Sequence, residues 1–247
     1  MKIIVIGSGK VGRTIIEHTV QEGHKVIAID NKKEAIEEII EQYDVMGLVG
    51  NGASYDVLKD AGVDKSSLVI AATSSDETNI LSCLVAKKLG AKSTIARVRS
   101  YEYMNQLNLI KKDLGISMTI NPEYEATLDI MKIIDFPEAI RIESFAKGKV
   151  DLVEFYVPEN SPLVGQSLIS IYQKYQMQVL VCAVQRNDEV FIPTGSFVIN
   201  AKDKIHITAK KSQLRKFINK VGLIENKIKS VMIIGGGKMA HYLGNEL

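Results

Sequence analysis

From Lys2 to Ile120 the sequence alternates between short apolar runs and amphipathic stretches, and this alternation restricts the fold more than any other feature of the chain. The apolar runs predict strands over Lys2–Ile6, Lys25–Ile29, Val45–Val49, Leu68–Ala72, Thr94–Val98 and Ser117–Ile120. The stretches between them predict helices from the first glycine loop to about Glu22 and over Lys32–Tyr43, Tyr55–Ala61, Asp76–Leu89 and Tyr101–Leu114. Continuously apolar strands are typical of a sheet that is covered on both faces. The sequence therefore predicts a Rossmann-like, doubly wound parallel α/β sheet.

Two of these predicted helices carry terminal signals. Asp76 is expected to be the N-cap of its helix, and Gly90 is expected to follow the end of the same helix. Gly115 is expected to close the next helix, because glycine adopts the left-handed conformation that ends many helices.

The pattern changes after Pro122, where a second, smaller α+β domain is expected. A helix with an apolar face is predicted over Glu123–Ile134, and Phe136-Pro137 ends it. Short strands follow over Ile140–Ala146, Leu152–Val157, Gln178–Gln185, Val190–Ile192 and Lys204–Thr208, with helices near Ser167–Tyr175 and Ser212–Val221. Arg186–Glu189 predicts a hairpin turn. We therefore expect a first domain over residues 1–138, a second over 139–222 and a linker over 223–229.

Residues 230–247 repeat the start of the chain. Ile6, Gly7, Gly9 and Lys10 recur as Ile234, Gly235, Gly237 and Lys238. This segment is expected to be the truncated start of a second Rossmann-like repeat, so we expect the chain to be a piece of a longer protein with two such units. Ala240 stands where the first copy has its third glycine, which argues against nucleotide binding by the second copy.

The segment Gly7–Gly12 reads GxGxxG between a predicted strand and a predicted helix, which is the context that a dinucleotide-binding loop requires. Asp30 ends the second predicted strand 18 residues later, close to the spacing of about 20 at which a carboxylate binds ribose hydroxyls. That carboxylate favours NAD over NADP, although Lys32 and Lys33 nearby leave NADP open. The alternative is that the glycines only allow close packing of strand and helix. Candidate cofactor residues in this part are Gly7, Ser8, Gly9, Lys10, Val11, Gly12, Asp30, Asn31 and Lys32.

Three further loops are expected at the same carboxyl edge of the sheet, where doubly wound folds bind ligands. They follow the third, fourth and fifth predicted strands and add the candidates Asn51, Gly52, Ala53, Ala72, Thr73, Arg97 and Arg99. The alternatives are ordinary turns for the first two loops and salt-bridged surface positions for the two arginines. Lys10 is expected to reach a phosphate as a point charge.

No catalytic residue is predicted. The four histidines, His18, His24, His206 and His241, do not fall where a nicotinamide ring would lie, and no metal-ligand spacing or GxSxG motif occurs. Tyr55–Lys59 fits the YxxxK motif of short-chain dehydrogenases. In that family the motif follows a later strand, whereas here it opens the helix after the third predicted strand, so we interpret it as a chance match. Cys83 and Cys182 are expected to be buried free thiols in a reducing cytosol.

Composition argues against two further classes. The formal net charge of +2 gives no electrostatic footprint for nucleic acid, and only a local basic patch is left open. No apolar run approaches the roughly 18 residues that suggest a membrane span.

The chain resembles the TrkA family of bacterial potassium-uptake regulators, which are built from RCK domains. The matching segments are VIGSGKVGRTI at 5–15, Asp30, GNGAS at 50–54, AATSSDETN at 71–79, ARVRS at 96–100, NPEYEA at 121–126, NSPLVGQSL at 160–168 and FIPTGSF at 191–197. The resemblance covers the whole chain, and the repeat is similar to the tandem members of the family.

The resemblance implies a regulatory subunit without enzymatic activity. It implies binding of NAD(H), with ATP or ADP as further ligands, and a homodimer formed through the helix at about Glu123–Ile134. Such dimers build a higher-order gating ring on the cytoplasmic face of a membrane potassium transporter or channel of the TrkH/KtrB type. Glu123 is the residue implied for a divalent cation. The alternatives are an NAD-dependent oxidoreductase with substrate residues in the second domain and, less favoured, a redox-sensing transcription factor.

Overall fold

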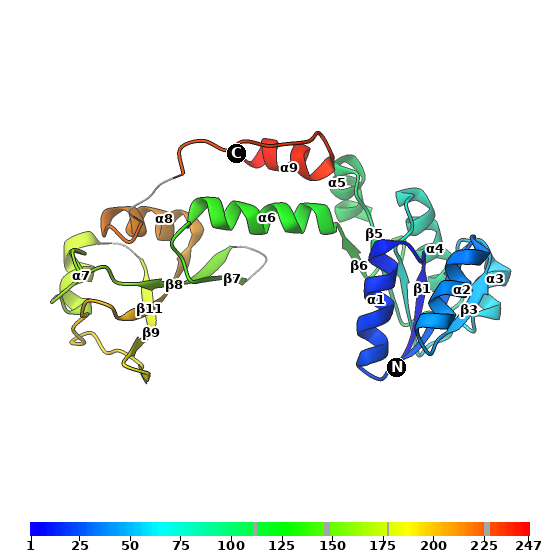
Figure 1. Ribbon diagram of the computed structural model, residues 1–247, viewed down its shortest axis with the longest axis horizontal. Helices are drawn as coiled ribbons and strands as arrows, with labels where there is room; N and C mark the ends of the chain where they lie inside the picture. The colour runs from blue at the N-terminus through cyan, green and yellow to red at the C-terminus, as the bar shows by residue number, and fades with distance from the viewer. Residues whose placement is uncertain (111–112, 146–148, 177, 225–227) are drawn as a thin grey trace. The chain divides into compact units, whose positions relative to one another are not determined.

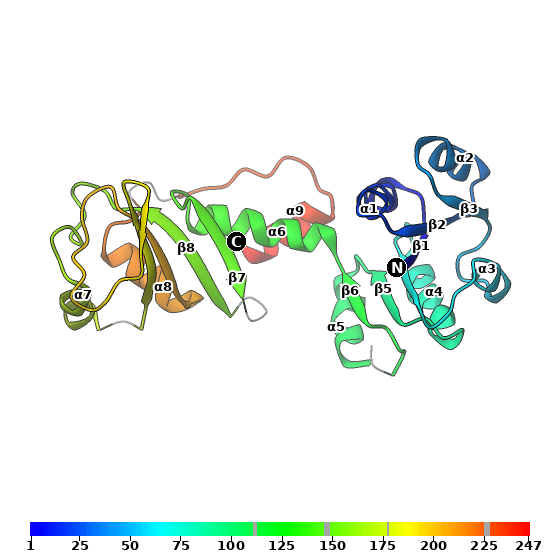
Figure 2. The ribbon, with the colours of Figure 1, turned by 90° about the horizontal axis from the view of Figure 1, so that it is seen from below.

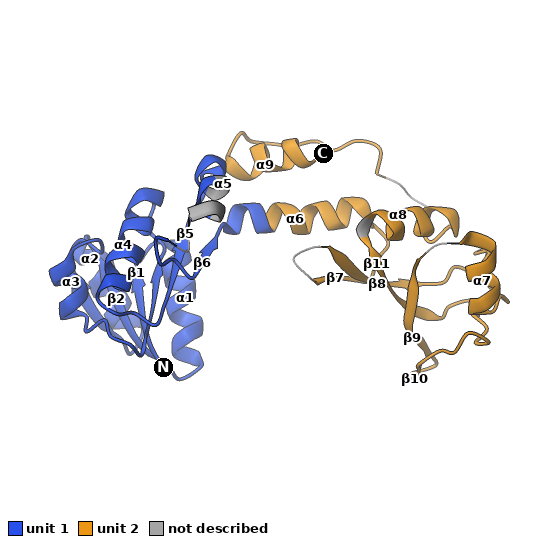
Figure 3. Cartoon of the chain, turned by 180° about the vertical axis from the view of Figure 1, so that it is seen from behind, with its two compact units in different colours: residues 1–125 blue, residues 126–247 orange. Residues whose placement is uncertain are grey.

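The computed structural model describes all residues of the chain except 111–112, 146–148, 177 and 225–227. The described chain forms two compact units, residues 1–125 and residues 126–247, which are coloured separately in Figure 3. Figure 1 labels the helices and strands of both units. The boundary between the units falls inside helix α6 (Pro122–Asp135).

Unit 1 contains a six-stranded parallel sheet with the order β3-β2-β1-β4-β5-β6. The strands are β1 (Lys2–Ile6), β2 (Lys25–Asp30), β3 (Met46–Val49), β4 (Ser67–Ala71), β5 (Ser93–Arg97) and β6 (Met118–Ile120). The helices between them are α1 (Lys10–Gln21), α2 (Lys33–Gln42), α3 (Tyr55–Asp60), α4 (Asp76–Lys88) and α5 (Tyr101–Ile110). This confirms the predicted Rossmann-like fold. The strand order reverses between β1 and β4, which is the point where such sheets bind ligands.

Successive residues of β1 supply the cores on the two faces of this sheet. Ile3 and Val5 are buried in the cluster that includes residues of α1 and α2. Ile4 and Ile6 are buried in the cluster that includes residues of α3, α4 and α5. Figure 2 shows α1 and α2 on one side of the strands and α4 and α5 on the other. Burial on both faces explains why the strands are continuously apolar.

The prediction that Asp76 is an N-cap is wrong. Ser75 is the N-cap of α4, and its Oγ accepts a hydrogen bond from the N–H of Thr78 at 3.1 Å. The Asp76 carboxylate instead accepts from the backbone N–H groups of Arg99 and Ser100, at 2.9 and 2.7 Å. Asp76 therefore joins the start of α4 to the loop after β5, a long-range contact that local capping rules do not anticipate.

Unit 2 contains a five-stranded antiparallel sheet with the order β10-β9-β11-β8-β7. Its strands are β7 (Arg141–Phe145), β8 (Val150–Tyr156), β9 (Leu180–Arg186), β10 (Glu189–Phe191) and β11 (Lys204–Lys210). Its helices are α7 (Leu168–Tyr175), α8 (Lys211–Lys220) and α9 (Lys238–Glu246), together with the part of α6 beyond residue 125. The predicted second α+β domain is confirmed.

The core of unit 2 lies between its sheet and its helices. Phe155 on β8 and Ile207 on β11 are buried in the same cluster as Phe217 of α8 and Ile171 of α7. The predicted hairpin is also confirmed. It joins β9 to β10 through Asn187 and Asp188, which both have positive φ (48° and 66°), as a tight two-residue turn requires.

The repeated segment at the end of the chain forms only part of the predicted start of a Rossmann unit. Helix α9 forms where α1 forms in the first copy, and Gly235 has φ +103°, close to the +96° of Gly7. Residues 230–234, which correspond to β1, lie outside any strand, and the Ile234 side chain is 93% exposed. A single strand without neighbouring strands cannot bury its side chains or pair its backbone, which is consistent with the absence of a strand here.

None of the helices in the described part of the chain combines the length and apolar character needed to cross a bilayer.

Candidate functional site

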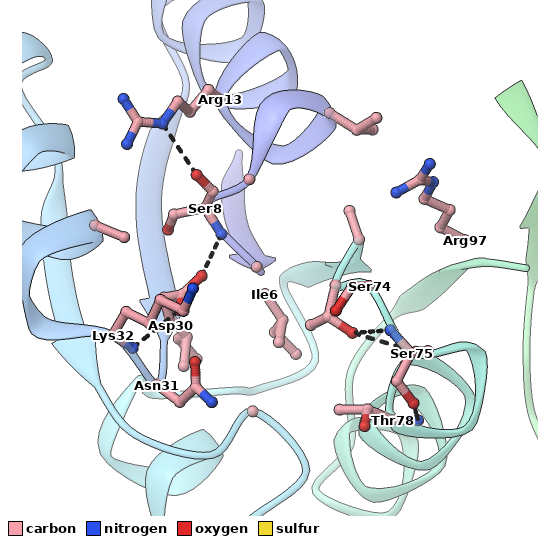
Figure 4. Close-up of a pocket in the computed structure, with 18 of the residues that line it drawn as sticks. Ile6, Ser8, Arg13, Asp30, Asn31, Lys32, Ser74, Ser75, Thr78 and Arg97 are labelled. Carbon is pink, nitrogen blue, oxygen red and sulfur yellow. Dashed lines mark hydrogen bonds between the residues drawn. The ribbon is translucent and has the colours of Figure 1, made fainter.

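A cavity of about 1040 Å³ lies at the carboxyl edge of the parallel sheet in unit 1. Its walls come from the end of β1 with the loop that follows it and the first turn of α1, the end of β2, the loops after β2, β3 and β4, the last residue of β5, and the first turn of α6. Figure 4 shows most of the side chains that line it. The predicted site residues that line the cavity are Gly7, Ser8, Gly9, Lys10, Val11, Asp30, Asn31, Lys32, Asn51, Gly52, Ala72, Thr73, Arg97 and Glu123.

Three predicted residues do not line the cavity: Gly12, Ala53 and Arg99. Gly12 lies beneath the loop, and Ala53 donates its N–H to the Asn51 side chain at 2.9 Å. The Nε atom of Arg99 lies 3.7 Å from Oδ1 of Asp76, and a terminal nitrogen of its guanidinium donates to the carbonyl of Ser74. Arg99 therefore braces two of the loops at the sheet edge.

The three glycines of the loop have three different structural roles. Gly7 has φ +96°, and a Cβ there would lie 2.8 Å from the Thr73 backbone nitrogen. A Cβ on Gly12 would lie 1.8 Å from the carbonyl oxygen of Gly7, so only glycine allows α1 to pack this closely. A Cβ on Gly9 would meet nothing within 4 Å, so its backbone is open to the cavity. This division matches the roles of tight turn, close packing and ligand approach in dinucleotide-binding loops.

Asp30 joins the glycine loop to the loop after β2. Its Oδ2 accepts the N–H of Ser8 at 2.6 Å, and its Oδ1 accepts the N–H of Lys32 at 3.0 Å. Figure 4 shows both bonds on one side of the cavity. A carboxylate has about four lone-pair sites, so each oxygen can accept a further hydrogen bond from a hydroxyl.

Arg13 supports the same wall of the site, although sequence reasoning did not single it out. Its Nε donates to the Ser8 carbonyl at 3.0 Å, and its terminal nitrogen pairs with Glu38 of α2. The N-terminus of α1 follows the loop, and the first intrahelical bond runs from Arg13 N–H to Gly9 C=O at 2.9 Å. The N–H groups that precede this bond have no partner within the helix and form a natural site for an anion.

Asn79 on α4 connects the loops after β4 and β5, and it too was missed from the sequence. It is fully buried. Its Oδ1 accepts from the backbone N–H and the hydroxyl of Thr73, at 2.8 and 2.7 Å, and its Nδ2 donates to the Arg97 carbonyl at 2.8 Å. A buried side-chain amide needs such partners. Asn79 therefore fixes the two loops that form this wall of the cavity.

Arg97 and Glu123 form an ion pair in the cavity wall. The Arg97 guanidinium lies 2.5 Å from Glu123 Oε1, and the two side chains are 12% and 23% exposed. The described residues contain no group of three or more histidine, cysteine, aspartate or glutamate side chains that could hold a metal ion. In this structure the Glu123 carboxylate pairs with Arg97. Its expected role at a divalent cation stays a prediction.

The other sequence features lie away from the cavity. Tyr55 and Lys59 of the YxxxK match are both exposed on α3 and do not line the cavity. Cys83 is a free, fully buried thiol, and burial raises its pKa to about 12. Cys182, expected to be buried, is instead partly exposed, and it is the extra residue at the register shift between β9 and β11.

Comparison with known proteins places this geometry in a family. The TrkA-N domain model matches residues 3–122, and the TrkA-C domain model matches residues 152–222. The chain belongs to the TrkA family. Over its full length it is 31% identical to the Trk system potassium uptake protein TrkA of Vibrio alginolyticus and 32% identical to that of Halomonas elongata. A TrkA homolog of Archaeoglobus fulgidus is also 32% identical. The chain covers 55% of each, so it spans about half the length of these relatives.

Solved structures show the same fold. The GsuK channel matches 99% of this chain with a TM-score of 0.63 at 18% identity, and the chain covers 43% of it. The GsuK channel bound to NAD matches 99% of the chain with a TM-score of 0.62 at 19% identity, again with 43% of that structure covered. At these identities the likeness extends to the fold alone.

Proposed function

We propose that this chain is the nucleotide-binding part of a regulatory protein in a potassium-uptake system, with NAD(H) or ATP or ADP as the ligand. One observation carries the proposal. A glycine loop, a helix N-terminus and an acceptor carboxylate line one cavity at the reversal of strand order. In this arrangement the ribose hydroxyls donate to Asp30, and the phosphates lie against the backbone at Gly9 and the start of α1.

The potassium part of the proposal rests on the relatives. The relatives at about 30% identity are named as Trk system potassium uptake proteins. The GsuK channel has the same fold, and one structure of it is bound to NAD. We therefore propose that this chain binds NAD(H) and acts with a membrane transporter or channel of the TrkH/KtrB type. The chain would act at the cytoplasmic face of that partner.

We propose that the chain has a regulatory role and not an enzymatic one. Among the described residues that line the cavity there is no histidine, cysteine or tyrosine. The two carboxylates in the wall, Asp30 and Glu123, are held by the loop N–H groups and by Arg97. The alternative is an NAD-dependent oxidoreductase. Incubation with NADH and a panel of aldehydes, ketones and keto acids should leave the absorbance of NADH unchanged. Turnover at about 1 per second or faster, a usual enzymatic rate, would favour the oxidoreductase.

Assembly is the remaining part of the proposal. Helix α6 carries Leu128, Ile130, Met131, Ile133 and Ile134, and Ile133 is 62% exposed. An exposed apolar side chain on such a helix favours a symmetric dimer, the commonest soluble assembly. Dimers of this kind would build the gating ring.

Calorimetric titration of the purified chain with NADH, ATP, ADP and NADPH tests the central part. We expect saturable binding of at least one adenine nucleotide, with NADH bound more tightly than NADPH. Absence of binding by all four nucleotides at millimolar concentration would contradict the proposal.

A further inference from the structure

The wall of the cavity that lies across from Asp30 carries a charge pair of its own. Arg97, the last residue of β5, pairs with Glu123 of the first turn of α6 at 2.5 Å. Both side chains line the cavity. Figure 4 shows Asp30 and Arg97 on opposite sides of it, with the glycine loop residue Ser8 nearer to Asp30. The cavity thus has an acceptor carboxylate at one end and a guanidinium at the other.

Arg97 is firmly positioned but not fully hydrogen-bonded. The backbone carbonyl of Arg97 accepts a hydrogen bond from the buried Asn79 side chain. The Arg97 side chain is only 12% exposed and pairs with Glu123. Its Nε is buried and has no hydrogen-bond partner among the described residues. A guanidinium offers five N–H donors, and a buried donor without an acceptor is unfavourable. The Nε atom is itself buried, so a ligand in the cavity would meet the rest of the guanidinium, whose terminal nitrogen holds Glu123.

The position of Arg97 determines which part of a ligand it would meet. In the proposed binding mode the ribose is at Asp30 and the first phosphates are at Gly9 and Lys10. The part that extends past these phosphates is directed to the wall formed by Arg97 and Glu123. Adenine nucleotides differ in this part: AMP ends before it, whereas ATP ends there in phosphate groups.

We propose that Arg97 and Glu123 form an exchangeable pair, in which a terminal phosphate of the ligand takes the Arg97 guanidinium from Glu123. This inference rests on the proposed function. A guanidinium binds phosphate as readily as carboxylate, in the same planar geometry. Glu123 is 23% exposed, so its released carboxylate can be hydrated. Glu123 lies in the first turn of α6, the helix that continues into unit 2. The charge of the ligand therefore determines whether a carboxylate at the start of this helix is paired with Arg97 or released.

Calorimetry with AMP and ATP in the presence of EDTA tests the exchange without a bridging metal. The proteins compared are the wild type, Glu123→Gln, Arg97→Gln, Arg97→Lys and the double variant Arg97→Gln/Glu123→Gln. Glu125→Gln is the matched control, because Glu125 is an exposed carboxylate in the same turn of α6 that does not line the cavity. Thermal unfolding of each variant establishes that it is folded.

Removing the competing carboxylate should strengthen ATP binding by Glu123→Gln about tenfold, and removing the guanidinium should weaken it about tenfold in Arg97→Gln. Arg97→Lys, which keeps the charge without the planar geometry, should lie between Arg97→Gln and the wild type. Binding of AMP should stay within about twofold of the wild type in every variant, because AMP does not reach this wall. Glu125→Gln should match the wild type with both ligands.

The double variant separates exchange from simple charge repulsion. If Glu123 acts by holding Arg97, its removal has no effect once Arg97 is absent, so the double variant should bind ATP as Arg97→Gln does. A gain in ATP affinity from Glu123→Gln that persists in the Arg97→Gln background would overturn the exchange. Equal changes for AMP and ATP would also overturn it. A wild type that binds NADH but not ATP would overturn the exchange alone, whereas a wild type that binds none of NADH, ATP, ADP and NADPH would contradict the proposed function itself.

Discussion

The Asp30 carboxylate provides the sharpest test of how the cavity recognises its ligand. Its two oxygens hold the N–H groups of Ser8 and Lys32, at 2.6 and 3.0 Å, and remain able to accept ribose hydroxyls. The substitution Asp30→Ala removes these acceptors. Hydrogen bonds to a charged group contribute about 1.5–3 kcal/mol, so NADH should bind roughly ten- to a hundredfold more weakly. NADPH should lose less affinity than NADH, because the same change removes a negative charge that repels its 2′-phosphate.

The comparison of the two cofactors distinguishes recognition from damage to the loop. Calorimetric titrations would use the wild type, Asp30→Ala, the isosteric Asp30→Asn and the control Asp60→Ala, which changes an exposed aspartate of α3 outside the cavity. We expect the ratio of NADH to NADPH affinity to fall in both Asp30 variants and to be unchanged in the control. Equal NADH affinity for the wild type and Asp30→Ala would refute the ribose assignment. A parallel loss of both cofactors would show that Asp30 only supports the loop.

Three further predictions concern packing, assembly and reactivity. Gly12→Ala should lower the free energy of unfolding by about 1–3 kcal/mol in denaturant titrations, because its Cβ would lie 1.8 Å from the Gly7 carbonyl oxygen. Gly244→Ala, a helical glycine with open space around it, should cause no such loss, and equal effects would show that the close contact is unimportant. Light scattering should show a dimer at micromolar concentration that Ile133→Glu weakens, whereas a wild-type monomer would exclude the α6 interface. A thiol reagent at pH 8 should leave Cys83 unmodified in the native protein, since its pKa is about 12 and its side chain is buried, and should modify it after unfolding. Rapid labelling of native Cys83 would contradict that burial.

The regular features of the fold were predictable from the sequence because they depend on local patterns. Alternating apolar runs and amphipathic stretches predicted the parallel sheet and its helices. The same holds for the glycine loop and Asp30, since the spacing of a turn, a helix start and a strand end is a local property. The hairpin at Asn187 and Asp188 followed from the same kind of local reasoning.

The cavity wall opposite Asp30 was less predictable, because it depends on contacts between distant segments. Asn79 joins loops that follow two different strands, and Asp76 is bound to the backbone of Arg99 and Ser100 and does not cap its own helix. The two arginines of ARVRS therefore have different positions, although they are two residues apart. Arg97 lines the cavity beside Glu123, and Arg99 braces the loops outside it. Spacing along the chain does not distinguish these two roles.

Potassium flux through the membrane partner is the measurement that decides whether nucleotide binding regulates uptake. The full-length protein would be reconstituted in vesicles with its membrane transporter, and potassium uptake would be measured with and without NADH, ATP and ADP. We expect flux to change with an adenine nucleotide, Asp30→Ala to shift the response to higher nucleotide concentration, and Asp60→Ala to respond as the wild type does. Flux that is the same with and without every adenine nucleotide would contradict this regulation of uptake.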